Sequence, residues 1–417
     1  MMLKRVLARI CPGRASLLAG TALTAALILI LPMAWAQSPP GTKTTLSKEH
    51  MAGLLARHSK EVAKTNSLLI KDRRLGPVAV KTTLNPVLQK RAENLLRSRS
   101  SRRAAMVVVE ANTGRVLVMA GVRKRRVDPR VALDASAPAA SLFKVITAAA
   151  ALEETNLIPS SKLRYAGRPH TLYRYQVKNQ TRRKTRRISL RKSFAESNNP
   201  VFARLGAHRL GENILSTYAH ALGFDRKLRF ELPVGISRMA QADTKYEVGE
   251  VASGYHRATT TSPLHAALMV AVFVSGGRFL EPYLVERATG AGGEVLYLGR
   301  PQASRRLVSS QTCRQMRQLF EATVSEGTAR KAFRRLNRDR VLKHLKVGGK
   351  TGTLRGPDRK ELFEWFAGYA RHPRTGKTLA VATLAVHGKY RRTNPKALAR
   401  QIMRQAFQVS STRAGKM

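Results

Sequence analysis

Segments with β-strand character lie near both ends of the body of this chain, and helical patterns fill the stretch between them. The strand segments are residues 78–84, 104–109, 115–120, 345–353, 363–370 and 379–386. Strands that are rich in apolar residues must pair with others and bury a face. We therefore expect an α+β fold, in which one antiparallel sheet is assembled from both ends of the chain and a helical layer packs against it.

Helix signals separate the two groups of strands. Asn85 is expected to cap a helix with Pro86 at its first position. The segment Ser141–Glu154 is strongly apolar and predicts a buried helix. From there to about Ser325 the pattern is mostly helical with polar loops, and residues 394–407 predict a closing helix.

The first 36 residues have the pattern of a secretory signal. A basic start is followed by an apolar run from Leu17 to Leu31, then by Pro32 and the cleavage-like Ala34-Trp35-Ala36. The run nearly reaches the length of a membrane span, so an uncleaved anchor is the alternative. In either case we expect the body to be exported, to the periplasm or the outer face of the bacterial inner membrane.

The remainder divides into three parts. Residues 37–77 are expected to be a spacer with one short helix after Ser47, residues 78–410 to be one catalytic domain, and residues 411–417 to be a tail. With 417 residues, 43% of them hydrophobic, the chain can fill a core of this size. The spacer is too short for a second catalytic domain.

The charge balance is strongly positive. Lys and Arg total 76 against 25 Asp and Glu, a formal net charge of +51. Such a surface attracts anionic partners, and an anionic wall polymer or a membrane surface fits an exported protein. No nucleic acid is expected, because export and the scarcity of aromatic residues among the cations argue against it. Ordinary solvated loops, or adaptation to an acid exterior, are the alternatives.

Ser141-Leu142-Phe143-Lys144 is the first candidate for chemistry. Serine is a weak nucleophile and needs a base within hydrogen-bonding reach, and positions i and i+3 share a helix face. A buried helix lowers the pKa of its lysine toward that of a base. Ser189-Leu190-Arg191-Lys192 repeats the pattern, but it lies in a stretch with 12 cations and no acid between Glu154 and Glu196, so we interpret it as a surface coincidence.

Two further motifs follow in order. Ser197-Asn198-Asn199 is an S-x-N, and Lys350-Thr351-Gly352-Thr353 is a K-T-G-T on a β-type run. The order S-x-x-K, S-x-N, K-T-G is the set used by serine enzymes that open β-lactams or D-alanyl peptides. Each motif alone has little weight, but the ordered set is specific.

On these motifs the chain resembles the transpeptidase domain of penicillin-binding proteins, over roughly residues 78 to 410. Further matching segments are Lys81–Asn85, Val107–Val109, Thr113-Gly114, Met119–Gly121, Thr261–His265, Ser275–Gly277 and Trp365–Tyr369. The resemblance implies a five-stranded antiparallel sheet flanked by helices, with an all-helical subdomain. It also implies covalent binding of β-lactams and action on D-Ala-D-Ala stem peptides of peptidoglycan.

The resemblance also implies roles for the site residues. Ser141 would attack the D-alanyl carbonyl and Lys144 would take its proton. Ser197 and Lys350 would relay a proton to the departing D-alanine, and Asn199 would bind the substrate amide. Thr351 and Thr353, on the strand that contains Gly352, would hold the terminal carboxylate. The backbone N–H groups of Ser141 and Thr353 would form the oxyanion hole.

Several alternatives stay open. Transfer to an amine would be transpeptidation and transfer to water would be carboxypeptidation. A β-lactamase or a sensor that acylates once would use the same serine, although Glu231–Gly235 lacks the E-x-x-L-N form of a class A lactamase. No glycosyltransferase segment is expected, so the enzyme would be monofunctional. Asn198 departs mildly from the family, which often has serine there.

No cofactor and no metal are expected. The ten histidines lack the spacing of metal ligands. Cys313 is the only cysteine after the signal, so no internal disulfide is possible in the exported body, and it is expected to be a small buried apolar residue.

Overall fold

A computed structural model describes residues 46–98, 101–178, 185–356 and 358–414. The expected secretory signal or anchor at residues 1–36 lies outside them. Among the residues that are described, no helix has both the length and the apolar character needed to cross a bilayer.

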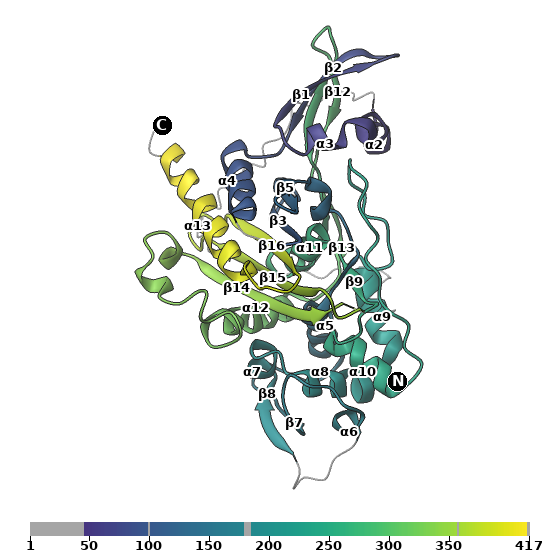
Figure 1. Ribbon diagram of the computed structural model, residues 1–417, viewed down its shortest axis with the longest axis vertical. Helices are drawn as coiled ribbons and strands as arrows, with labels where there is room; N and C mark the ends of the chain where they lie inside the picture. Colours follow the sequence, from purple (N-terminus) through teal and green to yellow (C-terminus); the bar gives the residue numbers. More distant parts are fainter. Residues whose placement is uncertain (1–45, 99–100, 179–184, 357, 415–417) are drawn as a thin grey trace, which may run out of the picture. The chain divides into compact units, whose positions relative to one another are not determined.

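Six antiparallel strands form the central sheet, in the order β14-β15-β16-β3-β4-β5 (Figure 1). Their bounds are β3 Arg103–Glu110, β4 Val116–Arg123, β5 Arg126–Val127, β14 Lys346–Arg355, β15 Leu362–Arg371 and β16 Thr378–His387. The early strand β3 pairs with the late strand β16, from Glu110 opposite Leu379 to Arg103 opposite Val386. The α+β fold with a sheet built from both ends of the chain is therefore confirmed.

The sheet has one strand more than the five expected. β5 returns beside β4 through Lys124 and Arg125, which have φ angles of 48° and 67°. Two-residue turns with positive φ at both positions usually contain Asn or Gly. Because this turn consists of two cationic residues, the sequence carried no hairpin signal there.

Helices cover both faces of the sheet. α4 (Pro86–Arg97) and α13 (Pro395–Ala414) pack on one face and α11 (Pro263–Val274) on the other (Figure 1). Alternate residues of β3 join the two hydrophobic clusters, Met106 and its neighbours with α4 and α13, Val107 and its neighbours with α11. As predicted, Asn85 caps α4. The last helix continues into the expected tail, to Ala414.

The helical region packs below the strand β14 in Figure 1. Its longer members are α5 Lys144–Glu154, α7 Leu190–Ala195, α8 Asn199–Leu205, α9 Gly211–Ala221 and α10 Lys245–Ser253, with a π-turn at Gly206–Leu210. Short elements of the same region are β7 Lys162–Tyr165, α6 Arg174–Val177 and β8 Arg186–Ser189. α5 is apolar on nearly all sides because it contacts α8, α9, α10 and the later helix α12 (Ser310–Ser325).

Residues 278–306 differ from the expected helical pattern. They form β10 Arg278–Glu281, β11 Val285–Thr289, β12 Val295–Leu298 and β13 Gln302–Arg306, ahead of α12 Ser310–Ser325. Gly293, with a φ of 83°, makes the turn between β11 and β12. The prediction of mostly helical structure was wrong here, because these strands are too short to show a clear period.

Residues 46–77 also differ from the expected spacer. The helix after Ser47 is present as α2 (Lys48–Leu55), but η1 (Ala56–His58), α3 (Ser59–Val62) and the hairpin of β1 (Ser67–Asp72) with β2 (Gly76–Thr82) follow it. β2 pairs with β11 in a four-stranded sheet of order β1-β2-β11-β12. Because β11 lies far away in sequence, local pattern could not show that this segment is folded.

Several one-turn and two-residue elements complete the fold. They are η2 Pro129–Ala132, β6 Ala137–Pro138, β9 Thr260–Thr261, η6 Leu336–Arg338 and η7 Leu342–His344. β6 pairs with β9, and the backbone N–H of Ala139 donates to the carbonyl of Thr259. These bonds fix the chain just before Ser141.

Candidate active site

Ser141 lies in the 3₁₀ turn η3 (Ala140–Leu142), directly before α5. The sequence predicted one helix from Ser141, whereas the α-helix itself begins at Lys144. Ala140 has a φ of 50°, a left-handed conformation that a non-glycine residue adopts only under constraint. The turn leaves Ser141 half-buried and brings its Oγ to 2.9 Å from Nζ of Lys144.

Lys144 is completely buried, and its amine has three oxygen partners. Nζ contacts Oγ of Ser141, Oδ1 of Asn199 at 2.7 Å and the carbonyl of Ser253 at 2.5 Å. Burial lowers the pKa of Lys144 well below 10.5, and the positive charge of Lys350 lowers it further. A neutral amine in this position can accept the proton of Ser141.

The S-x-N motif forms the turn between α7 and α8. Ser197 has a φ of 59°, so its side chain leaves the chain in an unusual direction. Asn198 caps α8 by accepting from the backbone N–H of Val201. A serine could make the same cap, which explains how asparagine is tolerated at this position. Asn199, the first residue of α8, bridges Lys144 and the carbonyl of His170, the latter at 3.1 Å.

Lys350 lies on β14 and is also completely buried. Its Nζ contacts Oγ of Ser197 and the carbonyl of Thr351, each at 2.9 Å, and lies over the ring of Phe194. Burial lowers the pKa of Lys350 from 10.5 to about 7. The site therefore contains two serine–lysine pairs, and the charge of one lysine acts on the pKa of the other.

β14 is the edge strand of the central sheet and runs close past the Ser141 turn. Gly352 makes this possible, because a Cβ there would lie 3.3 Å from Cβ of Ala140. Opposite Gly352, the indole of Trp365 donates to the carbonyl of Pro138 at 2.9 Å. Thr353 is exposed at the outer end of the strand. The K-T-G-T segment thus stands beside the turn that contains Ser141.

The second S-x-x-K has a different setting. Ser189 caps α7 by accepting from the backbone N–H of Lys192, and the Lys192 side chain is exposed and lies 3.8 Å from Glu196. Among the described residues, the buried lysines bond to serines other than Ser189, so the interpretation of this copy as a surface coincidence agrees with the geometry.

A family model described as the penicillin binding protein transpeptidase domain matches residues 104–406. The chain belongs to the penicillin-binding protein transpeptidase family.

Curated relatives in this family show moderate identity. The peptidoglycan D,D-transpeptidase PbpA of Mycolicibacterium smegmatis is 26% identical over 349 residues, covering 74% of this chain and 67% of the relative. Stage V sporulation protein D of Bacillus subtilis is 27% identical over 230 residues, covering 51% of this chain. The chain spans about a third of that relative's length, 32%.

Solved structures share the fold. PBPA from Mycobacterium tuberculosis matches with a TM-score of 0.63 at 24% identity, covering 79% of this chain and 80% of that one. The D,D-transpeptidase domain of a peptidoglycan glycosyltransferase from Eggerthella lenta matches with a TM-score of 0.65 at 23% identity, covering 79% and 83%. The predicted fold class of the penicillin-binding proteins is therefore confirmed, with six strands in place of five.

Sequence reasoning missed two contacts at the candidate site. Gly254 ends α10 in the left-handed conformation, and a Cβ there would lie 1.9 Å from the carbonyl oxygen of Ala140. The hydroxyl of Thr328 lies 2.6 Å from that of Thr351, and its backbone N–H donates to the carbonyl of Ala195 at the end of α7. A glycine after a helical pattern signals a cap, but nothing local connects it to Ser141.

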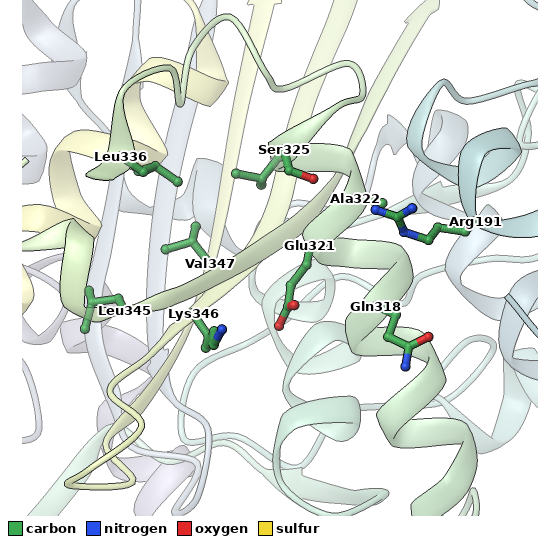
Figure 2. A pocket seen from close by; sticks show the side chains of 10 residues that line it. Arg191, Gln318, Glu321, Ala322, Ser325, Leu336, Leu345, Lys346 and Val347 are labelled. Carbon is green, nitrogen blue, oxygen red and sulfur yellow. The ribbon is translucent and has the colours of Figure 1, made fainter. Parts of the chain in front are cut away.

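A cavity of about 410 Å³ lies apart from these motif residues (Figure 2). Figure 2 shows Glu321, Gln318 and Ser325 of α12 on one side and Lys346 and Val347 of β14 on the other, with Arg191 reaching toward it from α7. Neither Ser141 nor either buried lysine lines it. This cavity is therefore separate from the candidate active site.

The remaining candidates from the sequence occupy the core. Glu231 is buried, where it accepts from the backbone N–H of Leu284 and from the hydroxyl of Tyr297, and burial raises its pKa. Cys313 is buried, as predicted, and burial raises the pKa of its thiol. Over the described ranges, no three His, Cys, Asp or Glu side chains gather as metal ligands would.

Proposed function

We propose that this protein is a peptidoglycan D,D-transpeptidase that acts on D-Ala-D-Ala stem peptides through an acyl-enzyme on Ser141. The observation that carries the proposal is the pair of buried lysines, Lys144 and Lys350, each with its amine 2.9 Å from a serine hydroxyl. Membership in the transpeptidase family and the names of the mycobacterial relatives support the same reaction.

In the proposed acylation, the neutral amine of Lys144 takes the proton of Ser141 as Oγ forms a bond to the penultimate D-alanyl carbonyl carbon. The backbone N–H groups of Ser141 and Thr353 stabilise the oxyanion. As the C–N bond breaks, Ser197 passes a proton to the departing D-alanine nitrogen and is reprotonated from Lys350. Asn199 binds the substrate amide, and Thr351 and Thr353 bind the terminal carboxylate.

In the proposed second step, an acceptor amine attacks the acyl carbon and gives up a proton through Ser197 to Lys350, which the first step left neutral. The new C–N bond forms, the C–Oγ bond breaks, and Ser141 recovers its proton from Lys144. Water in place of the amine would give the carboxypeptidase product. A β-lactamase of class A is disfavoured, because Glu231 is buried and its carboxylate is bonded to the backbone N–H of Leu284 and the hydroxyl of Tyr297. A hydrolase of the β-lactamase kind needs a carboxylate to activate water.

We also propose that the body acts outside the cytoplasm, where peptidoglycan lies. The basic and apolar pattern of residues 1–36 supports this. The net charge of +51 further supports attraction to an anionic wall polymer or membrane surface.

Fluorescent penicillin tests the nucleophile. Incubation of the full chain should give a covalent label on wild type and on Ser189→Ala, because Ser189 only caps a helix. Ser141→Ala should lose the label while its circular dichroism spectrum stays that of the wild type. An unlabelled wild type, or a labelled Ser141→Ala, would overturn the assignment.

Product analysis then separates the reactions. Stem pentapeptide supplied with an amine acceptor should yield the cross-linked peptide in excess of the tetrapeptide. Tetrapeptide alone would identify a carboxypeptidase, and rapid loss of the penicillin label would identify a β-lactamase.

A further inference from the structure

The segment from Ala166 to Lys178 is attached to the candidate active site through its backbone. The N–H of Asn199 donates to the carbonyl of Pro169 at 2.7 Å, and the Asn199 side-chain amide donates to the carbonyl of His170 at 3.1 Å. The same side chain accepts from Lys144. One residue therefore joins the proposed base to this segment.

The segment is held in one conformation from within. Gln176 is fully buried; its amide donates to the carbonyls of Ala166 and Arg168, and its oxygen accepts from the backbone N–H of Tyr173 at 2.9 Å. The hydroxyl of Tyr246, on α10, donates to the carbonyl of Leu172. α6, at the end of the segment, packs on α8 and α10 (Figure 1). A surface built here is preorganised.

Two aromatic side chains project from this rigid segment. Tyr173 and Tyr175 are 56% and 49% exposed, and their rings are nearly parallel, at 11°, with centroids 6.0 Å apart. Large aromatic side chains are normally buried, so a stacked pair held in solvent, on a segment that is bonded to Asn199, marks a candidate binding surface. Arg168 and Lys178 are exposed cations of the same segment.

This chemistry fits a sugar polymer that bears carboxylates. The apolar face of a pyranose ring stacks on a flat aromatic surface. The hydroxyl and N-acetyl groups of the sugar can accept hydrogen bonds from donors around that surface. Cations can pair with the carboxylates of the stem peptide. Resting on the function proposed above, we propose that Tyr173 and Tyr175 form a platform for the glycan strand of the peptidoglycan substrate. The platform selects stem peptides that are still attached to glycan.

The test compares two substrates on one variant, Tyr173→Ala/Tyr175→Ala. The KM for stem peptide linked to a glycan oligomer should rise about tenfold with kcat unchanged, because loss of stacking weakens binding before chemistry. The KM for the free stem peptide and the rate of penicillin acylation should stay within about twofold of wild type. Tyr173→Phe/Tyr175→Phe keeps the rings and should restore the KM for the glycan-linked substrate.

Leu69→Ala is the matched control, because Leu69 is 64% exposed on β1 of the other sheet. It should change neither KM. Equal effects of the tyrosine variant on both substrates, or no effect on either, would overturn the platform. Loss of binding to anionic lipid vesicles, with the KM for the glycan-linked substrate unchanged, would assign the surface to a membrane instead. Wild-type protein that penicillin does not label would refute the proposed function itself, a distinct result.

Discussion

Lys144 and Lys350 determine how the candidate site responds to pH. A lysine amine accepts a proton only when it is neutral, and burial favours the neutral form of both residues. The pKa of Lys350 is about 7, and that of Lys144 lies well below 10.5, partly because of the charge on Lys350. As pH rises through about 7, Lys350 loses the proton that it would pass to Ser197, whereas at low pH protonation of Lys144 would remove the base.

We therefore expect the rate constant of penicillin acylation to decrease on the alkaline side of about pH 7, where Lys350 loses its proton, and to decrease again at acid pH, where Lys144 gains one. The measurement is the labelling rate of the wild type from about pH 5 to about pH 9 at constant ionic strength. A flat profile would show that neither lysine titrates in the working range.

Burial of Lys350 also opposes folding. Its pKa is 10.5 before folding and about 7 in the native protein. Between these values the unfolded chain binds more protons, so stability rises with pH across this window, and the penalty is greatest below pH 7.

Lys350→Met removes this penalty. We expect its Tm at pH 7 to exceed that of wild type by several degrees, about 2–4 °C per kcal/mol gained, with a difference that shrinks toward pH 10. Exposed Lys343→Met is the control and should leave Tm unchanged. A lower Tm for Lys350→Met at pH 7 would mean that the bonds to Ser197 and Thr351 outweigh the burial of the amine.

At the scale of elements, the C-terminus of α10 supports the turn that contains Ser141. The carbonyl of Ser253 accepts from Lys144, and Gly254 follows directly with its α-carbon against the carbonyl of Ala140. Both contacts come from one helix end, so a shift of α10 moves the proposed base and the proposed nucleophile together.

Gly254→Ala tests this support. The new methyl group would lie 1.9 Å from the carbonyl oxygen of Ala140, so the Ser141 turn must shift, and acylation should slow by more than about tenfold. Gly276→Ala is the matched control: Gly276 also has positive φ, 81°, but nothing lies within 4 Å of its added carbon. Equal acylation rates for the two variants would show that α10 does not position Ser141.

Elements with strong local signals were predictable, and those defined by distant partners were not. Asn85-Pro86 and the long apolar strands near both chain ends predicted α4 and five strands of the sheet. The ordered motifs predicted that Ser141, Lys144, Ser197 and Lys350 come together. The sheet of β1 and β2 was missed because β2 pairs with the distant strand β11, and Gly254 was missed because only the packed fold brings it to Ala140. A sequence pattern indicates helices, strands and helix caps. The close approach of two backbone segments, such as Gly254 and Ala140, depends on the tertiary structure.

At the scale of the whole molecule, the charge of +51 acts over distances longer than any hydrogen bond. Exposed cations are frequent along the β7–β8 hairpin, at Lys162, Arg164, Arg186 and Arg187. Since these charges lie in water, salt screens them.

Co-sedimentation with purified sacculi should therefore be strong at about 50 mM salt and largely lost at about 500 mM. Anionic vesicles in a parallel series would show whether lipid competes with wall polymer. Binding to both that does not change with salt would refute the electrostatic attraction.

The pairing of β3 with β16 has a consequence for the order in which the chain can fold. These two strands lie at the centre of the sheet, yet Glu110 and its partner Leu379 are far apart in sequence. β3 can therefore pair with β16 only after the chain up to β16 has been synthesised. Contacts so distant in sequence make folding slow, because a long loop must close before its ends gain any stabilisation. During synthesis or export that starts with the N-terminus, the sheet therefore cannot be completed until nearly the whole chain is available to fold. During that interval β3 has an unpaired edge that can pair with other chains. We therefore expect a chaperone to be needed to prevent aggregation.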